Sequence, residues 1–195
     1  MNKNELFFDS IAHKWDEIVN HNSIKIRAVL ESLEIKGSDS ILDIGTGTGV
    51  LIPFLLDMLG EAGRITAIDI STQMLEIAKS KHDNCQVRFM KLDFIEAELQ
   101  EIFDIVLCYS CFPHLGDSRN AIRRMLKVLR KGGKLVIFHS ESREKINQLH
   151  GNMDSPVKRD SLPSAEELKC VIEAEGGKVI RIEDSEEKYV IVVTS

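Results

Sequence analysis

The sequence lacks a long hydrophobic run and a secretion signal. No apolar stretch approaches the roughly 20 residues that are needed to cross a bilayer, which predicts a soluble protein with no membrane partner. The N-terminal sequence MNKNELFFDS has neither an apolar core nor a small-residue cleavage site, so it predicts a cytoplasmic location. In a reducing cytoplasm we expect the four cysteines to be free thiols.

An excess of positive charge is also absent, because the formal net charge is −6 at pH 7. Such a balance gives no broad attraction to phosphate backbones or anionic lipids. It therefore disfavours nucleic acid as a partner and favours small-molecule or protein substrates. The one basic stretch, residues 123–134, fits the end of a helix, where cations are favoured.

Low-complexity linkers and repeats are missing too, and helical patterns alternate with short apolar runs from residue 24 to about 139. This order predicts an α/β fold, a Rossmann-like doubly wound sheet of seven mostly parallel strands. The chain is long enough for a single domain of this kind. Strands are expected at 40–44, 64–69, 86–92, 104–108 and 134–139, with a C-terminal antiparallel hairpin at 178–183 and 189–194.

Helices are expected between these strands and before them. Apolar residues at helical spacing between Phe7 and Ile18 predict a short helix that packs on the domain or closes over a pocket. A helix capped by Asp117 or Ser118 should run to Gly132-Gly133, whereas residues 140–161 read as polar and irregular. The remaining helices are expected at 24–33, 49–59, after Ser71, and at 163–175.

Residues 41–50 read ILDIGTGTGV, so the first strand ends at three glycines spaced at every second position. Glycine lets the backbone turn sharply and approach a ligand closely. A dinucleotide site would read G-x-G-x-x-G, but the sixth position here is Val50. Asp43 precedes the first glycine, where its carboxylate would repel a pyrophosphate and could pair with an ammonium group.

Two more aspartates end the next two strands. Asp69 follows Gly49 by about 20 residues, a position where a carboxylate can bind both hydroxyls of a ribose. Asp93 ends the third strand. The carboxyl ends of parallel strands border one crevice, where ligands bind in open α/β sheets. Together with the glycine loop, these residues indicate an adenosine-like ligand with a positively charged amino-acid tail.

These segments resemble the motifs of class I S-adenosylmethionine-dependent methyltransferases of the small, free-standing type. LDIGTGTG resembles the first motif, AIDIS the second, KLDF the third, FDIVLCYSCFPHL the fourth, and LRKGGKLVI the segment that enters strand five. Lys131 departs from the family, which usually has proline before the two glycines. The resemblance extends from about Phe8 to the C-terminus. It implies S-adenosylmethionine as cofactor and S-adenosylhomocysteine as product.

The resemblance also implies where the cofactor lies. Asp69 would hold the ribose, and Asp93 would lie near the adenine amino group. The other positions that the resemblance assigns to the cofactor are Asp43, Gly45, Thr46, Gly47 and Gly49 for the methionine portion, Ile70, Met74 and Phe94 for the adenine pocket, and Cys108 and Tyr109 beside the transferred methyl. The chain then divides into N-terminal helices or lid (1–36), a cofactor-binding core (37–139) and a substrate-side segment with the hairpin (140–195).

Two motifs that are missing from the sequence narrow the possible classes of methyl acceptor. The sequence after the fourth strand, CYSCFPHLGD, lacks the Asn/Asp-Pro-Pro-Tyr/Phe arrangement of methyltransferases that act on amide or exocyclic amino groups. No Pro-Cys pair occurs either, which disfavours cytosine C5 methylation. We therefore expect a small-molecule acceptor beneath the N-terminal helix. The residues expected to border it are Trp15, His21, Tyr109, His114, His139, Arg143 and His150.

Histidines collect near the predicted methyl-transfer site and leave three interpretations open. His114 or His139 acts as the general base, since an imidazole suits proton removal near neutral pH. Alternatively, His114, His139 and His150 bind a metal, giving a metal-dependent or metal-chelate-modifying methyltransferase. In the third interpretation they are structural or shape the substrate site.

The segment after the fifth strand carries two further alternatives. Arg143 could clamp a carboxylate or phosphate, or its segment is a solvated helix start capped by Ser140 or Ser142. A rival function of another class is a non-catalytic module that binds S-adenosylmethionine.

Overall fold

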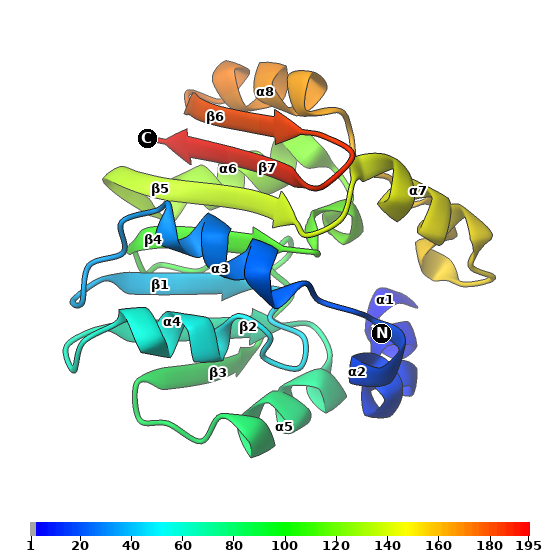
Figure 1. Cartoon of the computed structure of the whole chain (residues 1–195), viewed down its shortest axis with the longest axis horizontal. Coiled ribbons are helices and arrows are strands. Elements are labelled where there is room, and N and C mark those ends of the chain that lie inside the picture. The colour runs from blue at the N-terminus through cyan, green and yellow to red at the C-terminus, as the bar shows by residue number, and fades with distance from the viewer. Residues whose placement is uncertain (1–2) are drawn as a thin grey trace.

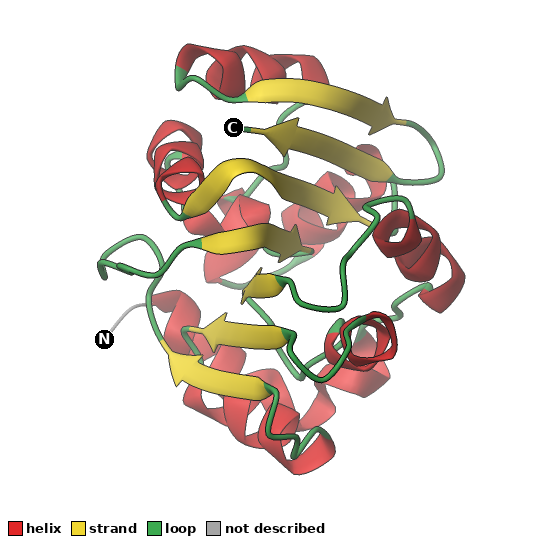
Figure 2. Cartoon of the chain, turned by 90° about the vertical axis from the view of Figure 1, so that its left-hand side faces the viewer, coloured by secondary structure: helices red, strands yellow, loops and turns green. Residues whose placement is uncertain are grey.

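The computed structural model describes residues 3–195 as a seven-stranded sheet with helices on both faces (Figures 1 and 2). The strand order is β3-β2-β1-β4-β5-β7-β6; β1 to β5 are parallel, and β7 runs antiparallel to both β5 and β6. The predicted fold is thereby confirmed. The strands are β1 (Ser40–Ile44), β2 (Arg64–Asp69), β3 (Val87–Lys91), β4 (Phe103–Tyr109), β5 (Leu129–His139), β6 (Lys178–Asp184) and β7 (Tyr189–Thr194).

The helices begin at residues that suit a helix N-terminus. Side chains of Ser71, Asp117 and Ser142 each accept a backbone N–H of the following turn, and Ser164 forms a capping box with Glu167. The helices are α1 (Lys3–Ile11), η1 (Ala12–Lys14), α2 (Trp15–Ile18), α3 (Ser23–Glu31), α4 (Ile52–Met58), α5 (Thr72–Lys81), η2 (Phe112–Leu115), α6 (Ser118–Lys127), α7 (Arg143–Asn152), η3 (Pro156–Arg159) and α8 (Ala165–Ala174). No helix within residues 3–195 combines the length and apolarity needed to span a membrane.

Two hydrophobic clusters cover the faces of the sheet. On one face, α3 and α4 bury residues such as Leu30 and Leu55, and both helices lie in front of the strands in Figure 1. On the other face, α6 and α8 bury residues such as Met125 and Leu168. Because the strand order reverses between β1 and β4, the connections that follow these paired strands run to opposite sides and leave room for a ligand at their carboxyl ends.

One predicted helix end is wrong. Helix α6 ends at Lys127, and Gly132 and Gly133 lie inside β5 instead of terminating the helix. A Cβ at Gly133 would meet the carbonyl oxygens of Asp104 and Arg130, so the glycine is needed for close strand packing. The predicted helix at 49–59 also starts later, at Ile52, because Gly49 still belongs to the loop.

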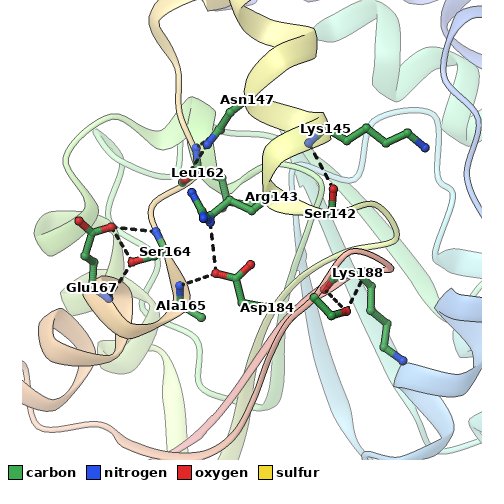
Figure 3. A network of polar contacts seen from close by, with 11 residues as sticks. Ser142, Arg143, Lys145, Asn147, Leu162, Ser164, Ala165, Glu167, Asp184 and Lys188 are labelled. Atoms are coloured by element: carbon green, nitrogen blue, oxygen red, sulfur yellow. Dashed lines mark hydrogen bonds and ion pairs between the residues drawn. The ribbon is translucent and has the colours of Figure 1, made fainter.

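Residues 140–161 are not irregular, because they contain α7 and η3. The side chain of Asn147 bonds the backbone N–H of Leu162 at 2.7 Å and its carbonyl at 3.0 Å, which ties α7 to the chain before α8 (Figure 3). Figure 1 shows α1, α2 and α7 together beyond the carboxyl ends of the parallel strands. Helices from both ends of the chain therefore border the same edge of the sheet.

Candidate functional site

Two hollows lie at the carboxyl edge of the sheet. The first, here called the cleft, has a volume of about 110 Å³ and lies where the glycine loop, β2 and β3 end. The second, the side cavity, has a volume of about 480 Å³ and is bordered by α1, α2 and α7. Both hollows are lined by Phe8, Trp15, Ser110 and His114. The two hollows therefore adjoin at these four residues.

The glycine loop forms one side of the cleft in a backbone conformation that needs glycine. Gly45 and Gly47 have φ values of 67° and 55°, in the left-handed region. A Cβ at Gly45 would also overlap the side chain of Cys111, so this position is closed to larger residues. The side chain of Cys111 therefore lies against the loop at Gly45 and fills the space that a larger residue there would need.

Asp69 lies at the opposite side of the cleft and holds the loop in place. Its carboxylate accepts the N–H of Gly47 at 2.8 Å and the N–H of Ser71 at 2.9 Å. Burial raises the pKa of Asp69, while these backbone hydrogen bonds oppose the shift. A carboxylate offers about four lone-pair sites, so Asp69 retains acceptor capacity for a ligand in the cleft.

An apolar slot continues the cleft beyond Asp69. Ile70, Met74 and Phe94 line it, as does Asp93, whose carboxylate accepts the N–H of Ile95 at 3.0 Å. Apart from Asp93, these side chains give the slot apolar walls that suit an aromatic ring.

Asp43, Thr46 and Gly49 lie behind the wall of the cleft and do not line it. Asp43 is only 1% exposed, and its Oδ2 atom has no hydrogen-bond partner among the described residues. Burial, with a contribution from the charge of Asp69, raises the pKa of Asp43 to about 7. The nearby Thr46 side chain opposes this shift, but an unpaired oxygen on a buried carboxyl is unusual and points to a partner that the protein itself does not supply.

Cys108 and Tyr109 also lie off the wall of the cleft. Cys108 is fully buried, and the Tyr109 hydroxyl bonds Ser140 Oγ and His21 Nδ1, both at 2.9 Å. The residues that reach the cleft at this strand end are Ser110 and Cys111. Ser110 is held at a φ of 51°, a conformation that non-glycine residues rarely adopt.

The N-terminal helices cover the cleft and are fastened by acidic side chains. Asp9 accepts the Ser71 hydroxyl at 2.6 Å and the Gln73 N–H at 3.0 Å, at the start of α5. Asp16 accepts the Thr48 hydroxyl at 2.7 Å and pairs with Lys81. Asn4, which sequence patterns did not single out, also lines the cleft. The contacts of Asp9 and Asp16 therefore anchor the segment that carries Phe8 and Trp15, which line both hollows.

Four histidines line the side cavity: His21, His114, His139 and His150. His114 Nδ1 lies 2.8 Å from Asp160 Oδ2, and His150 Nδ1 donates to the Asp160 carbonyl oxygen at 2.8 Å. Asp160 follows η3 and has no local sequence pattern that marks it. The His114 and His150 ring centroids are 4.9 Å apart.

His139 is 3% exposed, and its Nε2 atom has no partner among the described residues. Burial, with contributions from the charges of His114 and His150, lowers the pKa of His139 to about 3, so its ring is neutral at pH 7. Within residues 3–195, no three His, Cys, Asp or Glu side chains lie close enough to hold a metal ion. The metal interpretation of His114, His139 and His150 thus gains no support from their placement.

Arg143 is directed away from the side cavity. Its Nε donates to Asp184 Oδ2 at 3.2 Å, and the same oxygen accepts the N–H of Ala165 at 3.1 Å (Figure 3). Arg143 does not line the side cavity, and Ser142 caps the helix that it begins. This placement matches the interpretation of the segment as a helix start and leaves the guanidinium engaged with Asp184.

Known proteins resemble this chain in sequence and in fold. Residues 41–133 match a family described as Methyltransferase domain. The chain is 31% identical over 148 residues to Malonyl-[acyl-carrier protein] O-methyltransferase of Acetivibrio thermocellus, covering 75% of the chain and 52% of that protein. It belongs to the class I S-adenosylmethionine-dependent methyltransferases. The family that the sequence motifs resemble is thereby confirmed.

Other methyltransferases extend the comparison. The chain is 29% identical over 142 residues to the ubiquinone/menaquinone biosynthesis C-methyltransferase UbiE of Shewanella sediminis, covering 67% of the chain and 56% of that protein. It spans about half the length of these two curated relatives. The N-methyltransferase NodS of Bradyrhizobium japonicum, solved with S-adenosylhomocysteine, has the same fold, with a TM-score of 0.74, 17% identity, and coverage of 100% of this chain and 99% of that one. The names include O-, C- and N-methyltransferases, so likeness alone does not select an accepting atom.

We predict that His139 makes this methyltransferase sensitive to acid. Its pKa is about 3 in the folded protein and near 6.5 when unfolded, so between these values the unfolded chain binds more protons. The free energy of unfolding should then fall as the pH drops below 6.5, by at most about 1.4 kcal/mol per pH unit from this residue. Urea unfolding of wild type and His139→Asn at pH 7.5 and 5.0 measures the contribution.

The variant should lose less stability than wild type between the two pH values, whatever its stability at pH 7.5. Equal losses in both proteins would contradict the prediction.

Proposed function

We propose that this protein transfers the methyl group of S-adenosylmethionine, bound in the cleft, to a small molecule bound in the side cavity. The observation that carries the proposal is the wall of Phe8, Trp15, Ser110 and His114, which both hollows share. Methyl transfer needs the donor and the accepting atom aligned within about 3–3.5 Å of each other and shielded from water. Two adjoining hollows under one cover suit that requirement.

The residues of the cleft suit the parts of S-adenosylmethionine. The remaining acceptor capacity of Asp69 fits the ribose hydroxyls, and the slot with Met74, Phe94 and Asp93 fits the adenine ring and its amino group. The backbone at Gly45 and Gly47 in the cleft wall, with the unpaired Oδ2 of Asp43 behind that wall, fits the methionine portion with its ammonium. When bound, the cofactor supplies an electrophilic methyl group on a sulfonium.

The other residues orient and shield. The carboxylate of Asp69 fixes the glycine loop before any ligand arrives, so little ordering of the loop remains to be done on binding. Phe8 and Trp15 exclude water above the point where the hollows meet, held there by the Asp9 and Asp16 contacts. Ser110 supplies the floor between the hollows.

The cofactor part of the proposal predicts that Asp69→Ala weakens binding of S-adenosylhomocysteine. Hydrogen bonds to a charged group contribute about 1.5–3 kcal/mol, which corresponds to about a 10- to 100-fold increase in Kd. Isothermal titration calorimetry measures the change, with Asp57→Ala as the control, because Asp57 is exposed on α4 and pairs with Arg27 away from the cleft. Unchanged affinity in Asp69→Ala would place the ligand elsewhere.

The placement of Asp43 predicts proton release on binding. With a pKa of about 7, Asp43 is about half protonated at pH 7 in the free protein, and a nearby ammonium would lower that pKa. Binding of S-adenosylhomocysteine should release about half a proton at pH 7 and about a tenth at pH 8. Calorimetry in buffers of different ionisation enthalpy measures the release, which Asp43→Asn should abolish. A release that persists in the variant would exclude Asp43 as its source.

Turnover separates an enzyme from a non-catalytic module. The proposal predicts that S-adenosylhomocysteine accumulates when the protein is given S-adenosylmethionine and a panel of small phenols, thiols and carboxylates, with the methylated product identified by mass spectrometry. NAD should give no thermal stabilisation. Binding of S-adenosylhomocysteine with no methylated product from any acceptor would favour the binding module.

A further inference from the structure

The side cavity offers no unpaired charge to a ligand. Among its lining residues, Glu141 and Lys145 are the ones with a fixed charge, and they pair with each other at 2.6 Å. The carboxylate of Asp160 does not line the cavity and accepts a hydrogen bond from His114, and Arg143, which does not line it either, pairs with Asp184. A buried carboxylate, phosphate or ammonium would therefore lack a counter-ion, and unpaired buried charge is costly. The cavity favours an uncharged acceptor.

The imidazoles of the cavity reinforce this neutrality. Burial lowers the pKa of His21, His139 and His150, which leaves all three rings uncharged at neutral pH. Neutral imidazoles donate and accept hydrogen bonds without attracting ions. The unpartnered Nε2 of His139, a side chain 97% buried by its 3% exposure, calls for a polar group on the ligand.

Apolar side chains from three elements supply most of the remaining wall. Phe8 comes from α1, Ile18 from α2 and Leu149 from α7. Ile18 and Leu149 are 57% and 55% exposed, so apolar surface continues to the rim. These walls fit an aromatic or aliphatic body that carries few polar groups.

An uncharged hydroxyl needs a base before it can accept a methyl group, and His114 is placed to provide one. It lines both hollows, so it lies where acceptor and methyl donor would meet. Asp160 accepts the N–H of its Nδ1 at 2.8 Å, which leaves the lone pair on Nε2. A carboxylate that orients an imidazole in this way fixes both its tautomer and its direction.

We propose that the acceptor is an uncharged, largely apolar phenol or enol, with His114 as the catalytic base and Asp160 as the residue that positions it. The inference rests on the proposed function. The hydroxyl proton moves to His114 Nε2, and an oxygen electron pair forms the new O–C bond. The S–C bond breaks with its electron pair kept by sulfur, giving S-adenosylhomocysteine, and the proton leaves His114 for solvent.

Three naphthalenes that share one ring system and carry a neutral, an anionic or a cationic substituent test the acceptor class by binding alone. Calorimetry of the protein saturated with S-adenosylhomocysteine should find that 2-naphthol binds at least about tenfold more tightly than 2-naphthoate or 2-naphthylmethylammonium. The inference is overturned if either ion binds as tightly as 2-naphthol, or if 2-naphthol does not bind. If S-adenosylhomocysteine itself fails to bind, the proposed function has failed first, which keeps the two outcomes distinct.

Turnover of two naphthols tests the base. With 2-naphthol, His114→Gln should lower kcat by about 10²- to 10⁴-fold, and Asp160→Asn should lower it by less. With 1-nitro-2-naphthol, which is already ionised at pH 8 and should bind more weakly, both losses in kcat at saturation should shrink to about tenfold or less, since no proton has to be removed. A structural defect would lower the two rates equally.

Two controls accompany the kinetic experiment. Asp154→Asn changes an exposed carboxylate shortly before η3 and should leave kcat unchanged. Asp160 does not line the cleft, so Asp160→Asn should bind S-adenosylhomocysteine as wild type does. Equal losses with both naphthols, or no methylated product from either one, would overturn the assignment of His114 and Asp160.

Discussion

The carboxylate of Asp69 fixes the distance between the two sides of the cofactor cleft. One oxygen accepts the N–H of Gly47 from the loop after β1, and the other accepts the N–H of Ser71 from the turn after β2. With Asp69 only 9% exposed, water competes little for these bonds, and a charged acceptor makes them stronger than neutral ones. The loop that leaves space for a ligand is thus held by the residue that we assign to the ribose.

Much of the fold follows from local sequence patterns. The predicted bounds of β1, β2 and β7 match the structure, because each is a buried apolar run that ends at turn-forming residues. The end of α6 was misjudged, since Gly132-Gly133 resembles a helix stop although strand packing requires Gly133. For α7 the sequence indicates only a helix start, as one of two interpretations, because its composition is mostly polar and tertiary contacts such as those of Asn147 hold it in place.

Some features of the candidate site also follow from local sequence patterns, and others arise only from tertiary contacts. The glycine spacing and the aspartates at strand ends are local signals, and they located the cleft. The hydrogen bond between His114 and Asp160 joins residues 46 positions apart, and it forms because the fold brings the chain after η3 beside η2. Sequence spacing carries no record of such a contact. Nor did it reveal that Asp43 lies behind the loop, because the direction of a side chain depends on the register of its strand.

Ser110, which lines both hollows, has a strained backbone conformation that lowers the stability of the folded protein. Its φ of 51° is unfavourable by about 1 kcal/mol or more for a residue with a side chain, and its N–H is held by the Phe138 carbonyl at 3.0 Å. Glycine would relieve that strain and leave the floor between the hollows without its hydroxyl. At this residue folding stability and site geometry favour different residues. Selection for heat resistance alone would therefore favour replacing Ser110 with glycine.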